Sequence, residues 1–145
     1  GDLNEGRQEL MGLGTQTAAL AICGEPGSGT RVAKVEQWDG SSWTEVADVN
    51  TARTDAYHHF GTVTAGLIVG GQNPPNTPNI LANNETWDGS SWTNAPYSLG
   101  TARYRNGGSG STSAAIVFTG KTPAGAVATS EELGDAVTLK TITDS

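Results

Sequence analysis

A seven-residue segment occurs twice, letter for letter, and this repetition limits the possible folds more than any other feature of the chain. Trp-Asp-Gly-Ser-Ser-Trp-Thr starts at Trp38 and again at Trp87, an offset of 49 residues. Thr-Ala-Arg starts at Thr51 and again at Thr101, an offset of 50 residues. Apolar runs that end in glycine recur at similar spacing, at 18–24, 65–71 and 114–120. These landmarks predict an array of repeated structural units.

The repeat divides the 145 residues into three units of about 49 residues. The units cover 1–47, 48–95 and 96–145, and the third differs from the others because Ser130–Asp135 replaces the segment that carries the tryptophans. Terminal repeats differ from internal ones when they cap or close an array. We therefore expect Ser145 to lie near the C-terminus of the parent chain and Gly1 to follow earlier sequence.

Each unit has the composition of β-structure, with Thr, Val, Ile and Trp in short runs bounded by Gly, Pro, Asn and Asp. In the second unit the pattern predicts strands near 56–63, 65–71, 83–87 and 91–95, and almost no helix is expected in the chain. Asp39-Gly40 and Asp88-Gly89 predict type I′ hairpin turns, in which both central residues have positive φ. The flanking tryptophans would then lie close together across each hairpin.

The chain resembles kelch-repeat proteins over essentially its whole length. The resemblance rests on the apolar run into Gly70-Gly71, on Glu85-Thr86-Trp87-Asp88, and on Trp92 and Arg103. It implies an all-β fold of kelch-type β-propeller blades, about three four-stranded antiparallel blades at 1–47, 48–95 and 96–145. The sequence departs from the pattern in its shorter hairpin and in Cys23-Gly24 and Thr119-Gly120, which stand where Gly-Gly is usual. Propellers have four to eight blades, so this segment is expected to be part of a larger or oligomeric propeller.

The short hairpin and the segment 14–21 also resemble repeats in virion structural proteins of marine tailed phages. This resemblance implies a non-enzymatic structural or binding module of a virion or surface appendage, located in an extracellular particle. The implied partners are other virion subunits or further blades, and a glycan or protein on the host surface. Two alternatives stay open: a kelch-fold enzyme (an oxidase or a sugar-processing protein) whose active site lies in other blades, and a protein-interaction adaptor in the cytoplasm or at the cell surface.

Charge, hydropathy and cysteine content argue against several classes. The formal net charge is -7, and a nucleic-acid-binding module would need a basic surface. No apolar stretch approaches the ~18 to 20 residues that a membrane-spanning helix needs. The single cysteine, Cys23, excludes an internal disulfide and a cysteine-based zinc cluster, and its apolar neighbours predict a buried small hydrophobe.

Residues that could carry chemistry have simpler structural interpretations. Neighbouring residues of a strand point to opposite faces, so His58 and His59 are not expected to share a metal. Gly120-Lys121-Thr122 lacks the first glycine of a phosphate-binding loop, because that position holds Ala115. The cluster Gly107–Gly110 is interpreted as a turn. We expect no catalytic residue, no cofactor and no metal, and hence no enzyme.

The remaining candidates are structural residues and loop residues. Glu36, Glu85 and Glu131 recur with the repeat, which predicts buried bonding between blades, to arginines such as Arg53 or Arg103. The tryptophans are expected to pack between blades, with stacking on sugars as the alternative. The residues expected to maintain the repeat are Trp38, Trp43, Trp87, Trp92, Asp39, Gly40, Asp88, Gly89, Arg53 and Arg103. Binding is expected in the loops between the second and third strands of the units, at Glu25, Arg31, Asn73, Asn76, Thr77 and Asn79.

Overall fold

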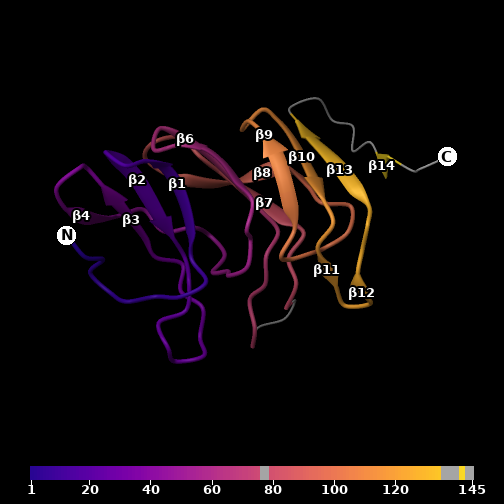
Figure 1. The fold of residues 1–145 in the computed structure, drawn as a ribbon, viewed down its shortest axis with the longest axis horizontal. Coiled ribbons are helices and arrows are strands. Elements are labelled where there is room, and N and C mark those ends of the chain that lie inside the picture. Colours follow the sequence, from indigo (N-terminus) through magenta and orange to yellow (C-terminus); the bar gives the residue numbers. More distant parts are fainter. Residues whose placement is uncertain (76–78, 135–140, 143–145) are drawn as a thin grey trace.

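The computed structural model describes residues 1–75, 79–134 and 141–142, and within them the chain forms strands and turns but no helix. Three four-stranded antiparallel sheets and one two-stranded hairpin make up the fold, which confirms the all-β class (Figure 1). No helix in the described part of the chain is long and apolar enough to span a membrane.

Each of the three repeated units contributes one four-stranded sheet. The first sheet has the order β1 (Met11–Thr15), β2 (Ala18–Ile22), β3 (Val35–Trp38), β4 (Trp43–Val46). The second has the order β5 (His59–Thr62), β6 (Ala65–Val69), β7 (Asn83–Trp87), β8 (Trp92–Ser98). The third has the order β14 (Thr141–Ile142), β13 (Ser130–Gly134), β10 (Ala114–Phe118), β9 (Gly107–Gly110), and β11 (Lys121–Thr122) pairs with β12 (Gly125–Ala126).

The strands of the second sheet lie close to their predicted positions. β7 has the predicted bounds, and β6 ends two residues early because Gly70 and Gly71 both have positive φ. β5 begins at His59, three residues later than predicted, after Asp55 has interrupted the extended backbone with a φ of 56°. β8 continues to Ser98, past the predicted unit boundary at 95, and only part of the predicted alternation at 137–143 lies within the described residues.

The interpretation of Gly107–Gly110 as a turn is wrong, because these residues form strand β9 and pair with β10. Close packing explains why a strand here consists of glycine and serine. A Cβ on Gly108 would lie 2.9 Å from the Phe60 ring and 3.0 Å from the Cβ of His58. A Cβ on Gly107 would overlap the Phe118 ring. Backbone approach thus overrides the weak strand propensity of glycine.

The Asp-Gly hairpins form, but the predicted type I′ conformation is wrong for both. Only the glycine of each pair has positive φ, 98° at Gly40 and 97° at Gly89. Asp39 instead folds the turn with its side chain, because Oδ1 accepts hydrogen bonds from the backbone N–H groups of Ser41 (2.8 Å) and Ser42 (2.9 Å). Asp88 accepts the same two bonds from the serines that follow it.

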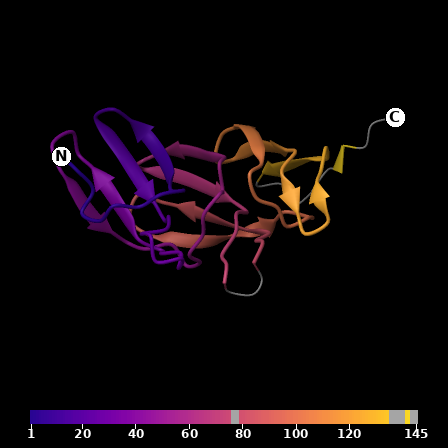
Figure 2. The same ribbon diagram turned by 60° about the horizontal axis from the view of Figure 1, so that its bottom comes forward.

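The three sheets follow one another along the long axis of the molecule (Figures 1 and 2). Register gives each sheet two faces, which we name the Trp face and the apolar face. The Trp face of the second sheet carries Trp87, Trp92 and Ile68, and it packs in one core on the apolar face of the first sheet. That apolar face consists of Met11, Leu13, Leu20, Ile22 and Val35.

The same joint is repeated between the second and third sheets. The apolar face of the second sheet (Phe60, Leu67 and Val69) packs on the equivalent of the Trp face in the third sheet, where Ala115, Val117 and Leu133 lie. Leu133 pairs with Ala115 as Trp87 pairs with Gly66, so leucine stands in the place of a tryptophan. Each sheet therefore stacks its Trp face on the apolar face of the preceding one.

Candidate functional site

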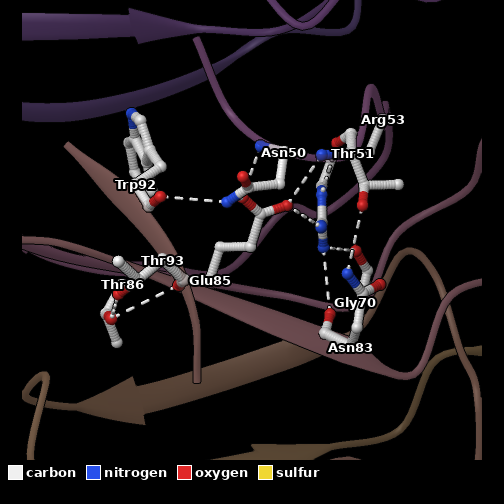
Figure 3. Close-up of polar contacts among 9 residues, drawn as sticks. All are labelled: Asn50, Thr51, Arg53, Gly70, Asn83, Glu85, Thr86, Trp92 and Thr93. Atoms are coloured by element: carbon white, nitrogen blue, oxygen red, sulfur yellow. Dashed lines mark hydrogen bonds and ion pairs between the residues drawn. The ribbon is translucent and has the colours of Figure 1, made fainter. Parts of the chain in front are cut away.

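A buried arginine–glutamate pair lies at the centre of every unit. In the second unit Arg53 and Glu85 are both fully buried, with Nη2 and Oε1 2.5 Å apart (Figure 3). Arg53 Nη1 also donates to the backbone carbonyls of Gly70 (2.8 Å) and Asn83 (3.0 Å). The pair thus joins the segment that enters the sheet to its second and third strands.

Glu85 completes the network with bonds from the same entering segment. Its Oε1 accepts from the Thr51 N–H at 3.0 Å, and its Oε2 accepts from the Asn50 N–H at 2.7 Å and from Asn50 Nδ2 at 2.9 Å. Each carboxylate oxygen therefore has two donors (Figure 3). A buried carboxylate so completely satisfied stabilises structure, and it has no free lone pair with which to act as a general base.

The first and third units contain the same pair. Arg7 Nη2 lies 2.7 Å from Glu36 Oε1, and Arg103 contacts Glu131 in the same way. Each arginine pairs with the glutamate of its own unit. The prediction that these glutamate side chains bond between blades is therefore wrong. The backbone makes the inter-unit link instead: Gly71 of the second unit donates its N–H to the carbonyl of Arg103 in the third at 3.0 Å.

The pair of residues that ends the second strand has the same unusual backbone in all three units. Cys23, Gly70 and Thr119 have φ of 59°, 62° and 59°, and the glycine that follows each has φ between 101° and 110°. A non-glycine residue in this left-handed region costs about 1–2 kcal/mol. Cys23 is also fully buried, and this burial raises the pKa of its thiol to about 12. The expectation that Cys23 is a buried small hydrophobe is confirmed.

The connections between the second and third strands all extend toward the same edge of the molecule, the lower edge in Figure 1. Their described parts are 23–34, 70–75 with 79–82, and 119–129, the last containing the β11–β12 hairpin. The tight hairpins lie at the other end of the sheets, where a Cβ on Gly40 would meet the Thr17 carbonyl and one on Gly89 the Thr64 carbonyl. One edge of the stack therefore carries the long connections, and the opposite edge carries the tight hairpins.

Charged residues that the sequence analysis missed lie beside these connections, in the segments that enter the sheets, and Asp55 and Arg105 link neighbouring units. Two residues after the buried arginines stand Glu9, Asp55 and Arg105, all with positive φ. Asp55 is fully buried, accepts a hydrogen bond from Gln72 Nε2 and lies 3.4 Å from Arg105 Nε. The signal was present in the sequence, because this position follows an invariant arginine yet changes from acid to base between units.

Two tyrosines lie beside the Asp55–Arg105 pair. Tyr57 is 49% exposed, and a hydrogen bond to Asp55 raises the pKa of its hydroxyl. The half-exposed guanidinium of Arg105 lies 5.6 Å from the centre of the Tyr104 ring, and its contact with Asp55 raises its pKa. We call the residues at these contacts the polar junction surface: Glu9, Arg31, Asp55, Tyr57, Gln72 and Arg105.

Of the loop residues expected to bind a ligand, Arg31 belongs to this surface. Its Nε donates to Thr54 Oγ1 of the second unit at 3.3 Å, and its Nη2 lies 3.8 Å from Glu9. Glu25 is buried and shapes its own loop by accepting from the Gly29 N–H at 2.5 Å, which is the main reason why the pKa of its carboxyl is lowered.

The second connection carries the other candidates. The N–H of Asn73 donates to the carbonyl of Asn79 at 2.8 Å, and Asn79 is exposed. The structure thus places these two residues across the base of one loop. Asn76 and Thr77 lie outside the described residues, so their part in binding stays a prediction.

The tryptophans form tilted pairs across the hairpins, as predicted, with ring centroids 5.5 Å apart for Trp38 and Trp43 and 5.3 Å for Trp87 and Trp92. Trp87 Nε1 donates to the Val63 carbonyl at 2.8 Å, so this indole is held inside the stack. The pair of the second unit is buried between two sheets, as expected for packing.

The histidines do not lie together at a site. His58 points to the third unit, where its Nδ1 lies 2.6 Å from the Asn106 carbonyl oxygen. His59 is partly buried in β5, and this burial lowers the pKa of its imidazole. In the described part of the chain no three His, Cys, Asp or Glu side chains are grouped as a metal site would require.

The comparisons with known proteins show the fold and no family. No protein-family model matches the chain. No curated protein matches it either. Among solved structures, the chain is similar to the one titled "Structure of YjhT", with a TM-score of 0.74 at 15% sequence identity. The match covers 98% of this chain and 47% of that one, so the chain spans about half the length of the structure it resembles.

Proposed function

We propose that the chain forms three blades of a kelch-type β-propeller and serves as a non-enzymatic binding module of a phage virion or surface appendage. One observation carries the binding role: the polar junction surface lies along the edge of the stack that carries the long connections (Figure 1). The support beneath it is the same in each unit, because a buried arginine–glutamate pair fixes the segment that enters each sheet.

The units also differ from one another at this edge. Glu9, Asp55 and Arg105 occupy equivalent positions, two acidic and one basic, and the connections beside them differ in sequence. A rigid scaffold with variable loops is the arrangement by which many proteins bind ligands. The virion setting of the proposal comes from the resemblance of the repeat to proteins of marine tailed phages.

The chemistry of the polar junction surface suits a host-surface glycan. The exposed ring of Tyr57 offers a face for a sugar ring, while Arg105 offers hydrogen-bond donors to hydroxyl groups. Outside this surface, the exposed Asn79 of the second connection offers a further donor. Ligand contacts would therefore come from both the connections and the segments that enter the sheets.

Binding of the purified chain to an array of bacterial surface polysaccharides tests this proposal. Tyr57→Ser and Arg105→Ala should each weaken binding to the recognised polysaccharide at least about tenfold, as loss of a central contact does. Glu45→Ala is the control, because Glu45 is exposed on β4 of the first sheet, away from these contacts. Absence of binding to any polysaccharide on the array, or equal binding by all three variants, would refute the glycan role.

A further inference from the structure

The charged groups of the polar junction surface are paired with one another, and this pairing limits the ligands that the surface can bind. Arg105 Nε lies 3.4 Å from Asp55 Oδ1. Arg31 Nη2 lies 3.8 Å from Glu9 Oε2. We propose that this surface binds uncharged sugars in preference to acidic ones, and that Asp55 determines this specificity. The inference rests on the proposed function and names the class of glycan that the surface takes.

Asp55 carries a charge that is buried and incompletely hydrogen-bonded. Its side chain is 0% exposed, whereas the Arg105 side chain is 52% exposed. Gln72 Nε2 donates to Oδ2, but Oδ1 accepts no hydrogen bond within the part of the chain that the structure describes. A buried charge is costly unless an opposite charge compensates it. The guanidinium of Arg105 provides this compensation, so Arg105 is committed to Asp55 rather than to a ligand anion.

The backbone holds this pair together across the joint between the second and third units. The N–H of Arg105 donates to the carbonyl oxygen of Asp55 at 2.8 Å. Beside it, Thr54 and Gln72 exchange two backbone hydrogen bonds of 2.9 Å. These contacts are made within the protein, so the carboxylate and the guanidinium stay close whether or not a ligand is bound.

The paired groups still offer hydrogen bonds of both kinds. Arg105 faces Asp55 with Nε, and its two Nη groups are further donors. The Glu9 side chain is 35% exposed and offers carboxylate oxygens as acceptors. A sugar hydroxyl both donates and accepts, so it can bind to an arginine and a carboxylate at once. A carboxylate or sulfate on a sugar can only accept, and Asp55 and Glu9 repel its charge.

The net charge of the protein favours the same class of ligand. The formal net charge is -7, which repels polyanions from the molecule as a whole. Within the polar junction surface, two carboxylates balance two guanidinium groups, so no excess of positive charge offsets this repulsion. An acidic polysaccharide would have to displace an ion pair of the protein in order to form one of its own.

Binding of the intact chain to uncharged and acidic polysaccharides tests the inference. We expect the wild-type chain to bind only uncharged members of the array, and not polygalacturonate, which is acidic. Asp55→Asn leaves Arg105 without its carboxylate and should raise the affinity for polygalacturonate at low ionic strength at least about fivefold, the effect of one ion pair in water. Glu45→Gln is the matched control, because it makes the same change in net charge at an exposed position on β4 and should not raise this affinity.

A second variant keeps the test valid if Asp55→Asn does not fold, which circular dichroism would show. Glu9→Gln removes the exposed partner of Arg31 and should also raise the affinity for polygalacturonate. Tighter wild-type binding to an acidic polysaccharide than to any uncharged one, or no gain in either variant relative to Glu45→Gln, would overturn the inference. Binding confined to acidic members of the array would refute the specificity alone, whereas absence of binding to any polysaccharide would refute the glycan role and the inference with it.

Discussion

Glu85→Gln should destabilise the protein by about 3–5 kcal/mol, the cost of breaking a buried ion pair. The structure shows why so small a change has such an effect. Each carboxylate oxygen accepts two hydrogen bonds, from Thr51 and Arg53 at one oxygen and from two nitrogens of Asn50 at the other. Glutamine has an NH2 group in place of one carboxylate oxygen. In either orientation of the amide, two of the four donors lose their acceptor and face this NH2 group.

The loss of charge adds to the loss of hydrogen bonds. Arg53 is fully buried, and glutamine leaves its guanidinium without a carboxylate. Hydrogen bonds to charged groups contribute about 1.5–3 kcal/mol each, so two broken bonds account for the range given above. Arg53 keeps its packing and its three backbone carbonyl acceptors, on Thr51, Gly70 and Asn83, and these keep the cost within that range.

Urea unfolding followed by circular dichroism measures the effect. Glu45→Gln is the matched control, because it makes the same chemical change at an exposed position and should alter the free energy of unfolding by less than about 0.5 kcal/mol. Asn50→Ala removes two side-chain hydrogen bonds, to Glu85 and to the Trp92 carbonyl, and should cost about 1–3 kcal/mol. If Glu85→Gln costs no more than Glu45→Gln, the arginine–glutamate pair does not stabilise the unit as argued.

Three further predictions follow from local geometry. Gly71→Ala should lower the free energy of unfolding, measured by urea titration, by about 2–5 kcal/mol, because the φ of Gly71 is 101° and a Cβ there would lie 2.8 Å from the Thr54 carbonyl oxygen. Gly6→Ala is the control and should have little effect, because no atom lies within 4 Å of a Cβ at that position. Hydrogen bonds from the following serines lower the pKa of Asp39 to about 2 and also lower the pKa of Asp88. The two carboxylates therefore contribute stability above about pH 3.8, the ordinary aspartate pKa, and this contribution is lost as the pH falls through their folded-state pKa values. The melting temperature should depend less on pH between pH 5 and pH 2 in the Asp39→Asn, Asp88→Asn double variant than in the wild type. The Cys23 thiol should react with a disulfide reagent at pH 8 at least about a hundredfold more slowly in the folded protein than in urea, and equal rates would contradict its burial.

Much of the fold could be predicted because it is encoded in local, repeated patterns. The heptapeptide at Trp38 and Trp87 specifies a hairpin, and the chain forms one at both places. Strand β7 was predicted to the residue, since Asn83–Trp87 ends at a turn marked by aspartate and glycine. Repetition makes such predictions stronger, because the same local pattern occurs in more than one unit and predicts the same structure each time.

The failures occurred where distant contacts determine the backbone. Gly107–Gly110 has the composition of a turn, and only the approach of Phe60 from the neighbouring sheet explains why it is a strand. Cys23 aligns with Gly70 in the repeat, but its residue type alone gives no sign that it adopts a positive φ.

The polar junction surface could be predicted only in part. Arg31 was expected from its loop, but Asp55 and Arg105 belong to different units and meet because the sheets stack. Glu25 has the charge of a ligand contact, yet the fold of its own loop buries it. Side-chain direction and the meeting of units are tertiary properties, which spacing within one repeat does not contain.

Acrylamide quenching of tryptophan fluorescence tests most directly the central claim that each unit stacks its Trp face on an apolar face. Trp38→Phe with Trp43→Phe leaves the second-unit pair, and Trp87→Phe with Trp92→Phe leaves the first-unit pair. The pair at Trp87 and Trp92 should be shielded, because the first sheet covers it. The pair at Trp38 and Trp43 should be quenched more strongly, because these side chains are only partly buried. Equal quenching of the two pairs would contradict the stacking.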